Sequence, residues 1–493
     1  MRIHPLPRLT PSLLAALLVL TATTTGRSAA AQASRGALAS GTFAVTHVSV
    51  VPMTRDTVLT DATVLVRDGR IAAVGPSSRV RVPAGARRID GRGKFLVPGL
   101  ADMHTHLFSD DSATAPDSVG PYELWVMVAN GVTTIRLMIG TPEQLALRTG
   151  VREGRVLGPQ LWVASPQLAG RKFDNGIAVT NAAEARAAVR GVAAAGYDFV
   201  KLTLSITPEV YDAVTDEAAK VGIRVVGHVE PVVGVERALA AGQSIEHLDA
   251  YLEAVLADSA PSRASVTQQG LFRLDNWRSM DHVDARKIAE IAGRTARAPG
   301  WGRWTSPTLN VFNDAFAIGP SEEEIRARPE WALLPSAFRE TYLAARPRYW
   351  SAAAAEVRTP ERRRRYVETR DALVKAIADS GGKVLAGSDT PEWFHMYGWG
   401  LHRELAALVA AGLTPYQALE AATRNPAGFL EATAEWGTIE VGKRADMVLL
   451  AADPLADIRN TTRIEAVSVG GRWLDRAVLD RMIADAGRRL NPP

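Results

Sequence analysis

The chain has 493 residues, of which 47% are hydrophobic, so it can bury a large core and is not expected to be disordered. The first 33 residues hold three arginines and no acid, so the 57 basic residues less these three leave 54 against 53 acidic residues. This near balance gives no reason to expect nucleic acid or anionic membranes as partners. The absence of cysteine excludes disulfides, thiolate metal ligands and a cysteine nucleophile.

Residues 1–33 have the features of a secretory signal peptide. Arg2 and Arg8 precede the apolar run LLAALLVL, and small residues follow it, with cleavage expected after Ala31 or Ala33. The apolar run is too short to span a bilayer, so we predict no stable membrane insertion. The sequence therefore predicts export to the periplasm or the medium, and a retained anchor is the alternative.

Alternating, turn-rich sequence flanks the middle of the chain on both sides. Residues 42–96 include TVLTDATVLVRDGRIAAVG, and residues 436–480 include GTIEVGKRADMVLL. Period-two alternation broken by DG and GR turns is typical of short antiparallel strands. We expect the two chain ends to form one small composite β-sandwich, followed by a short helix in LDRMIADAGRRL.

Between these ends, at residues 97–435, short apolar runs alternate with helical patterns. The expected strands are 97–106, 132–138, 158–165, 198–204, 223–228, 244–248, 304–309 and 383–389. Eight such alternations predict an α/β fold, a (β/α)8 TIM barrel. The interval between the sixth and eighth strands is too long for one strand and its helices. We therefore expect a mostly helical insertion at about 251–380, interpreted as a lid or cover.

Residues able to hold a metal stand where these apolar runs end. They are His104, His106, Lys201, His228, His247 and Asp389. The carboxyl ends of parallel barrel strands meet at one rim, so we expect these side chains to lie together. His104 and His106 are two residues apart and so face the same side of a strand. We predict two divalent cations, with zinc expected: the first on this pair and Asp389, the second on the histidines of the fifth and sixth strands.

Lys201 favours two metals over one. A lysine ammonium repels cations, but the neutral amine can react with carbon dioxide to give N6-carboxylysine, an anion with two oxygens. Two nearby cations would stabilise that anion between them. The apolar neighbours Phe199, Val200 and Leu202 disfavour the ammonium. The alternative is a strand-end lysine that reaches solvent.

Three segments resemble the amidohydrolase superfamily and, within it, imidazolonepropionase-like and Xaa-Pro dipeptidase-like exported hydrolases. They are LVPGLADMHTHL, GLTPYQALEAATRNPAGFL and GTIEVGKRADMVLLAADPL. The resemblance runs from about residue 42 to 475 and implies the barrel, the composite β-sandwich and the ligand assignment given above. Lys201 departs from the one-metal imidazolonepropionases. TTIRLMIG replaces the family's TTVRDxGG, and the long insertion is also unusual, so the substrate stays open.

The predicted site indicates a hydrolase. Two cations sharing a water would lower its pKa, and the resulting bridging hydroxide would attack the substrate while Asp389 acts as the catalytic proton carrier. The favoured reaction is hydrolysis of a small amide: a dipeptide, an Xaa-Pro peptide or an N-acyl amino acid. Ester, lactone, phosphotriester or cyclic amide hydrolysis is the alternative, and a non-catalytic exported binding protein is a third reading.

The expected partner is a small molecule or dipeptide, and a homo-oligomer is compatible with the sequence. A substrate carboxylate would need a cationic or hydroxyl side chain near the strand ends. The candidates for substrate binding are Arg136, Arg171, Tyr251 and, in the loop after the eighth strand, His395.

Overall fold

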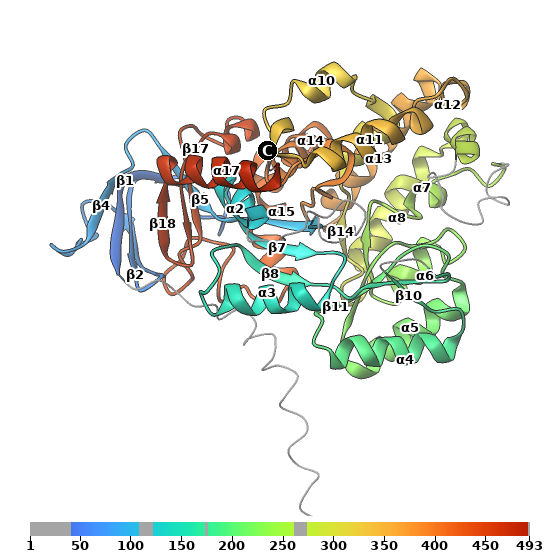
Figure 1. Ribbon diagram of the computed structural model, residues 1–493, viewed down its shortest axis with the longest axis horizontal. Helices are drawn as coiled ribbons and strands as arrows, with labels where there is room; N and C mark the ends of the chain where they lie inside the picture. Colours follow the sequence, from blue (N-terminus) through green and yellow to red (C-terminus); the bar gives the residue numbers. More distant parts are fainter. Residues whose placement is uncertain (1–40, 108–121, 173–175, 261–273, 492–493) are drawn as a thin grey trace, which may run out of the picture.

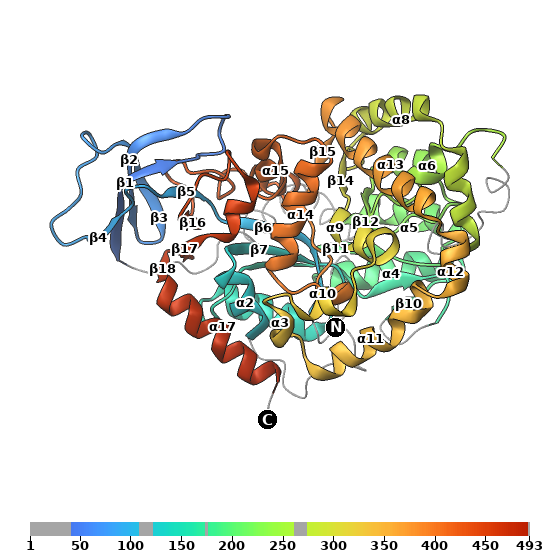
Figure 2. The same ribbon diagram turned by 90° about the horizontal axis from the view of Figure 1, so that it is seen from above.

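The computed structural model describes residues 41–107, 122–172, 176–260 and 274–491. The predicted signal peptide lies outside these described residues. Figure 1 and Figure 2 show a β-rich body, built from both ends of the chain, beside a larger α/β body built from the middle. Within the described ranges, no helix is long and apolar enough to cross a membrane.

The β-rich body is one eight-stranded sheet with the order β18-β17-β16-β5-β1-β2-β3, in which β4 pairs with β1. Its strands are β1 (Thr42–Val50), β2 (Leu59–Arg67), β3 (Arg70–Pro76), β4 (Arg87–Asp90), β5 (Phe95–Pro98), β16 (Met447–Leu450), β17 (Ile464–Val469) and β18 (Arg472–Asp475). The two chain ends meet where β5 runs antiparallel to β16, with Leu96 opposite Leu449. Strands from both ends of the chain contribute to this sheet. The ladders define one mixed sheet and do not by themselves separate it into the two layers of a sandwich.

The predicted C-terminal helix is present as α17 (Arg476–Leu490). It begins where the Asp475 side chain accepts a hydrogen bond from the Val478 amide at 3.1 Å. Its buried face includes Leu479, Met482 and Ala486, spaced at helical intervals, and the helix packs against α2 (Tyr122–Ala129). It therefore joins the sheet to the α/β body (Figure 2).

Each of the eight expected strands of the middle region has a counterpart. They are β6 (Leu100–Thr105), β7 (Val132–Leu137), β8 (Gln160–Val163), β11 (Phe199–Leu202), β12 (Arg224–Gly227), β13 (Ser244–Glu246), β14 (Trp304–Ser306) and β15 (Lys383–Val384). All neighbouring pairs among them are parallel, and most of their residues are buried, as short apolar runs require. Two further short strands, β9 (Gln167–Ala169) and β10 (Gly176–Ala178), were not predicted.

These strands form two sheets, β6-β7-β8 and β10-β9-β11-β12-β13-β14-β15. Single parallel bridges join the sheets at both seams, Ala164 to Phe199 and Thr105 to Thr390. The ladders therefore do not close into one continuous barrel. The parallel α/β arrangement is consistent with the predicted TIM barrel and brings the carboxyl ends of the strands to one side.

Further helices lie outside the insertion. They are α2, α3 (Pro142–Arg152), α4 (Ala182–Ala194), α5 (Pro208–Val221), α6 (Val235–Ala240), η7 (Glu392–Phe394), α14 (Trp399–Ala410), α15 (Pro415–Ala421), α16 (Arg424–Phe429) and η8 (Ile458–Thr462). Thr141, Thr207 and Thr414 each cap a helix whose first residue is proline. Gly222 ends α5 in the left-handed conformation, which glycine adopts without strain.

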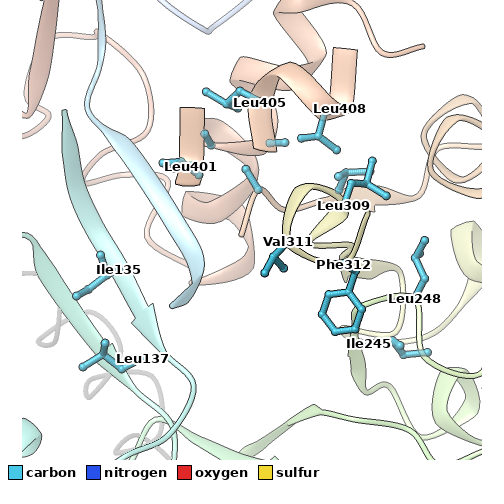
Figure 3. Packing of buried hydrophobic residues seen from close by; sticks show 14 of the residues in the cluster. Ile135, Leu137, Ile245, Leu248, Leu309, Val311, Phe312, Leu401, Leu405 and Leu408 are labelled. Carbon is cyan, nitrogen blue, oxygen red and sulfur yellow. The ribbon is translucent and has the colours of Figure 1, made fainter. Parts of the chain in front are cut away.

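The predicted insertion is mostly helical. Its helices are α7 (Tyr251–Ala254), η4 (Leu274–His282), α8 (Ala285–Arg297), α9 (Leu309–Asn313), η5 (Asp314–Ile318), α10 (Glu322–Arg326), η6 (Trp331–Leu333), α11 (Ser336–Tyr349), α12 (Ala352–Val357) and α13 (Pro360–Asp379). Figure 3 shows Leu401, Leu405 and Leu408 of α14, Leu309, Val311 and Phe312 of α9, and Ile245 and Leu248 at the end of β13 within one buried apolar cluster. The insertion is thus fixed to the α/β body through a shared apolar core, and this core carries α9 to the strand ends.

Candidate metal centre

His104, His106 and Asp389 form the first half of the candidate centre. Their ligand atoms lie within 4.8 Å of one another. The Nε2 atoms of His106 and His104 are 3.1 Å and 3.3 Å from Oδ1 of Asp389. All three residues are buried, and the Asp389 amide donates to the His104 carbonyl at 2.7 Å. The ends of the first and eighth strands are therefore hydrogen-bonded to one another where the three side chains meet.

His228 and His247, directly after β12 and β13, form the second half of the centre. Their rings stack with centroids 4.8 Å apart, and the His247 ring lies 4.5 Å from that of His104. His247 has a φ of 61°, in the left-handed region, so the chain turns sharply where the strand ends. Four imidazoles from three strand ends thus form one continuous group with Asp389.

Lys201, on β11, is only 2% exposed. A Cβ atom at Gly227 would lie 2.8 Å from Cδ of Lys201 and 2.3 Å from the Leu202 carbonyl, so glycine on the neighbouring strand makes room for the lysine side chain. Burial lowers the pKa of Lys201 to about 8, although the nearby carboxylates of Glu246 and Asp389 act in the opposite direction. The neutral amine, the form that reacts with carbon dioxide, is therefore more accessible here than in a free lysine.

Three of the four imidazoles are held at Nδ1 by an oxygen acceptor. Nδ1 of His104 is 2.8 Å from Glu246, and Nδ1 of His228 is 2.7 Å from Asp249. Nδ1 of His247 is 2.8 Å from the Thr308 hydroxyl, whose own hydrogen goes to the Pro307 carbonyl at 2.9 Å. A protonated Nδ1 leaves the lone pair on Nε2, which is the tautomer that binds a metal.

Burial also keeps two of these rings neutral. Burial, and then the nearby cationic Lys201, lowers the pKa of His104 well below its ordinary value. Burial and the neighbouring His228 do the same for the pKa of His247. Neutral imidazoles with fixed tautomers, a carboxylate and a buried lysine amine fit divalent cations as ligands.

Arg136, predicted to contact substrate, lies inside the α/β body with 0% exposure. Its Nη2 donates to both carboxylate oxygens of Glu246, at 2.9 Å and 2.8 Å, and its Nε donates to the Met103 carbonyl. Glu246 in turn holds His104. This placement does not support the predicted substrate contact, because the guanidinium is committed to a buried ion pair behind the ligand.

The other three predicted substrate residues also lie away from the cavity described below. Arg171 is exposed in the segment after β9, and the Tyr251 hydroxyl is buried against Thr295 of α8 at 2.9 Å. His395 is buried, with Nε2 3.2 Å from Asp314. Sequence position alone put these residues near strand ends, but Tyr251 and His395 contact the insertion and Arg171 is exposed.

Sequence reasoning missed Glu246, Asp249 and Thr308, which hold the ligands. A signal for Glu246 was present, because a carboxylate inside the buried strand SIE needs a buried cation as partner. The arginine within TTIRL is that partner. No comparable signal marks Asp249 or Thr308, because both stand in polar loop sequence.

A cavity opens beside His228 and His247, with an empty volume of about 520 Å³ that includes space open to solvent. One wall comes from the loops after β11, β12 and β13, and the other from the insertion. The insertion residues of that wall are Leu252, Glu253, Phe312, Phe316, Tyr366 and Arg370. The cavity therefore joins the second half of the candidate centre to the inserted helices.

Parallel strands with a buried His-His-Asp cluster at their carboxyl ends define an α/β protein with a metal-binding site. The sequence model of the Amidohydrolase family matches residues 95–474, and the chain belongs to this family. The resemblance read from the three sequence segments is thereby confirmed.

Two curated relatives match over most of the chain. The imidazolonepropionase of Symbiobacterium thermophilum is 26% identical over 400 residues, which is 78% of this chain and 82% of that protein. Adenine deaminase 3 of Rhizobium meliloti is 24% identical over 418 residues, 84% of this chain. The chain spans only 54% of that deaminase's length.

Solved structures share the fold over nearly the whole chain. A Bifidobacterium longum protein assigned as a prolidase is 27% identical, with a TM-score of 0.65, covering 90% of this chain and 99% of that one. The bottromycin amidohydrolase is 22% identical, with a TM-score of 0.69 and coverage of 96% and 98%. A Xaa-Pro dipeptidase with bound methionine is 20% identical, with a TM-score of 0.60 and coverage of 88% and 100%. The last two show the fold alone.

Proposed function

We propose that this protein is an exported, binuclear metal-dependent amidohydrolase on a (β/α)8 barrel, acting on a small amide such as a dipeptide, an Xaa-Pro peptide or an N-acyl amino acid. The observation that carries the proposal is the meeting of four imidazoles, Asp389 and the buried Lys201 at the ends of five strands. Family membership and the likeness to a prolidase support cleavage of a carbon–nitrogen bond.

Each side chain has a place in this scheme. His104, His106 and Asp389 would hold one divalent cation, His228 and His247 the other, and a carboxylated Lys201 would contact both. Bound divalent cations supply Lewis acidity and lower the pKa of water. Zinc suits the set, because it accepts imidazole nitrogen and carboxylate oxygen.

The chain's own groups then handle protons and position. Asp389 lies against both imidazoles of the first half, where its carboxylate can take a proton and pass it to the departing amine nitrogen. Glu246 and Asp249 keep the rings of His104 and His228 in one orientation. Burial of these groups excludes bulk water and strengthens every charge interaction among them.

The test uses the full chain produced with zinc and bicarbonate. Elemental analysis should find close to two divalent ions per chain. The metal-loaded protein should hydrolyse members of a dipeptide and N-acyl amino acid library faster than matched esters or phosphotriesters, and removing the metal with a chelator should abolish turnover. One ion per chain with full activity would contradict the binuclear part, and turnover of esters alone would contradict the amide part.

A further inference from the structure

The cavity beside His228 and His247 has more negative than positive side chains. Three carboxylates line it, from Glu230, Asp249 and Glu253, against the single guanidinium of Arg370. Two candidate metal ligands are part of the same lining, so a group held in this cavity lies beside the proposed centre. The charge of the lining therefore bears directly on which substrates enter.

Two of the three carboxylates already accept hydrogen bonds from other residues of the protein. Glu230 accepts a hydrogen bond from the Ser205 amide, and Asp249 accepts one from His228 at 2.7 Å. Glu253, on α7, differs from them. Among the described residues, the Glu253 carboxylate makes no hydrogen bond or ion pair with any other residue. It is the carboxylate of the lining that has no hydrogen-bond partner on another described residue.

Arg370 does not supply the missing charge. Its guanidinium is 1% exposed and donates to the His247 carbonyl at 2.8 Å and to the Pro307 carbonyl at 2.7 Å. It also lies over the rings of Phe312 and Tyr366, 5.3 Å from each centroid. These contacts fix the turn that carries His247 and leave Glu253 facing the cavity.

The rest of the lining is apolar. It includes Leu204, Val229, Leu252, Phe312 and Phe316. An aliphatic stem can pack against these side chains and lose its contact with water, while a charged tip at its end reaches the carboxylate. An uncharged tip would instead leave the carboxylate in the filled cavity without a partner, which costs free energy.

We propose that this cavity selects amides whose side chain ends in a cationic amine or guanidinium, with the stem against the aromatic wall and the cation paired with Glu253. The inference rests on the proposed function for its reaction and adds the substrate class. The sequence predicted that Arg136 would recognise a substrate carboxylate. The Arg136 guanidinium is instead ion-paired with Glu246, which holds His104, so the cationic side chain replaces the carboxylate as the recognised group.

The test compares substrates that differ only in the tip of one side chain. Alanyl-lysine is set against alanyl-norleucine, and lysyl-alanine against norleucyl-alanine, so that each pair keeps the same backbone charges. A charge-assisted hydrogen bond contributes about 1.5–3 kcal/mol, which corresponds to a preference of roughly 10- to 100-fold in kcat/KM for lysine in at least one pair. In Glu253→Gln the ratio should fall toward one. Glu323→Gln, on the exposed part of α10, is the control and should keep the wild-type ratio.

Binding separates this inference from the proposed function. Calorimetry should find that the metal-loaded protein binds lysine at least tenfold more tightly than norleucine, and that Glu253→Gln does not. If this preference exists and no amide is cleaved, the proposed function is wrong and the cavity inference stands. If amides are cleaved with equal kcat/KM for lysine and norleucine in both pairs, or if Glu253→Gln keeps the preference, the cavity inference is wrong and the proposed function stands.

Discussion

The two halves of the candidate metal centre are built from different parts of the chain. Around His104, the supporting groups are Glu246 and Arg136, which come from strands of the α/β body and are both fully buried. Around His247, the support comes from the insertion: Thr308 holds Nδ1, and Phe312 stacks on the ring with centroids 4.6 Å apart.

Because of this difference, the first half bears on metal binding, whereas the second half bears on substrate selection as well. The first half is enclosed by parallel strands that any member of the fold must form, so its geometry does not depend on the substrate. His228 and His247 of the second half line the cavity, and the facing wall of that cavity comes from the insertion. Under the proposed binuclear scheme, a change in the insertion should therefore alter specificity and the second metal together, with less effect on the first metal.

Lys201 lies between the two halves, and its replacement should have the largest effect on metal content and activity. Lys201→Ala should reduce bound metal from two ions to one and bring activity close to background, because it removes the group that is proposed to contact both cations. Acetate should restore part of the activity by taking the place of the carbamate. Metal analysis and kinetics, with the exposed Lys220→Ala as control, measure this. Full activity in Lys201→Ala would remove the carbamate from the scheme.

Asp389 tests whether the first half does more than bind metal. Asp389→Asn should reduce kcat on amides by about 10²-fold or more, the usual scale for a lost acid–base group. Esters with good leaving groups need no proton delivered, so they should lose less. Steady-state kinetics on matched amide and ester substrates would show the difference. An equal loss on both would mean that Asp389 serves only as a ligand.

Glu246→Gln and Asp249→Asn form a matched pair, one variant in each half. Each removes a carboxylate from Nδ1 of a ligand, so each should weaken metal binding by about 10- to 100-fold. Glu246→Gln also leaves Arg136 buried without a counter-charge, which should lower the free energy of unfolding by about 3–5 kcal/mol. Asp249 has no such partner, so its variant should unfold near wild type. Chelator competition and urea unfolding measure the two effects, and equal unfolding free energies would contradict the contrast between the halves.

The smallest expected effect is a pH dependence of substrate preference in the cavity. Burial, with the facing carboxylates of Asp249 and Glu230, raises the pKa of Glu253 to about 7. Arg370 and Tyr366 also line this space, and among the described residues neither makes a hydrogen bond or ion pair with the Glu253 carboxylate. The charged form gains population as the pH rises through 7, so the lysine-to-norleucine ratio in kcat/KM should rise by up to about tenfold between pH 6 and 8. The ratio should be flat in Glu253→Gln, and a ratio that falls with pH in the wild type would contradict the assignment.

The strands and the ligand-bearing residues were accessible from the sequence because each depends on a local pattern. A short apolar run that ends in His104 or His228 predicts both a buried strand and the position of its side chain. The observed strands are shorter than the predicted ones, as for residues 383–389, of which only Lys383–Val384 form a ladder. The rest of this segment still bonds to neighbouring strands, because the Leu385 amide donates to the Thr305 carbonyl of β14 and the Asp389 amide donates to the His104 carbonyl of β6.

The supporting network was not accessible, because it depends on which distant strands face each other. Arg136 on β7 and Glu246 on β13 belong to different sheets, and only the folded arrangement brings their side chains together. The role of Arg370 could not be predicted for the same reason, because in the sequence it is one of several arginines in a helical insertion. Its hydrogen bond to the His247 carbonyl depends on the left-handed turn at that residue.

The pairing of β5 with β16 has a consequence for the order in which the protein folds. During synthesis β1 to β5 emerge first, but β5 keeps an unpaired edge until β16 has been made, after the entire α/β body. An open strand edge is a site for wrong pairing, and contacts distant in sequence form slowly. A strand made after the α/β body therefore closes the sheet that β1 to β5 began, so a truncation before Met447 should expose an aggregation-prone edge even though every proposed metal ligand is still present.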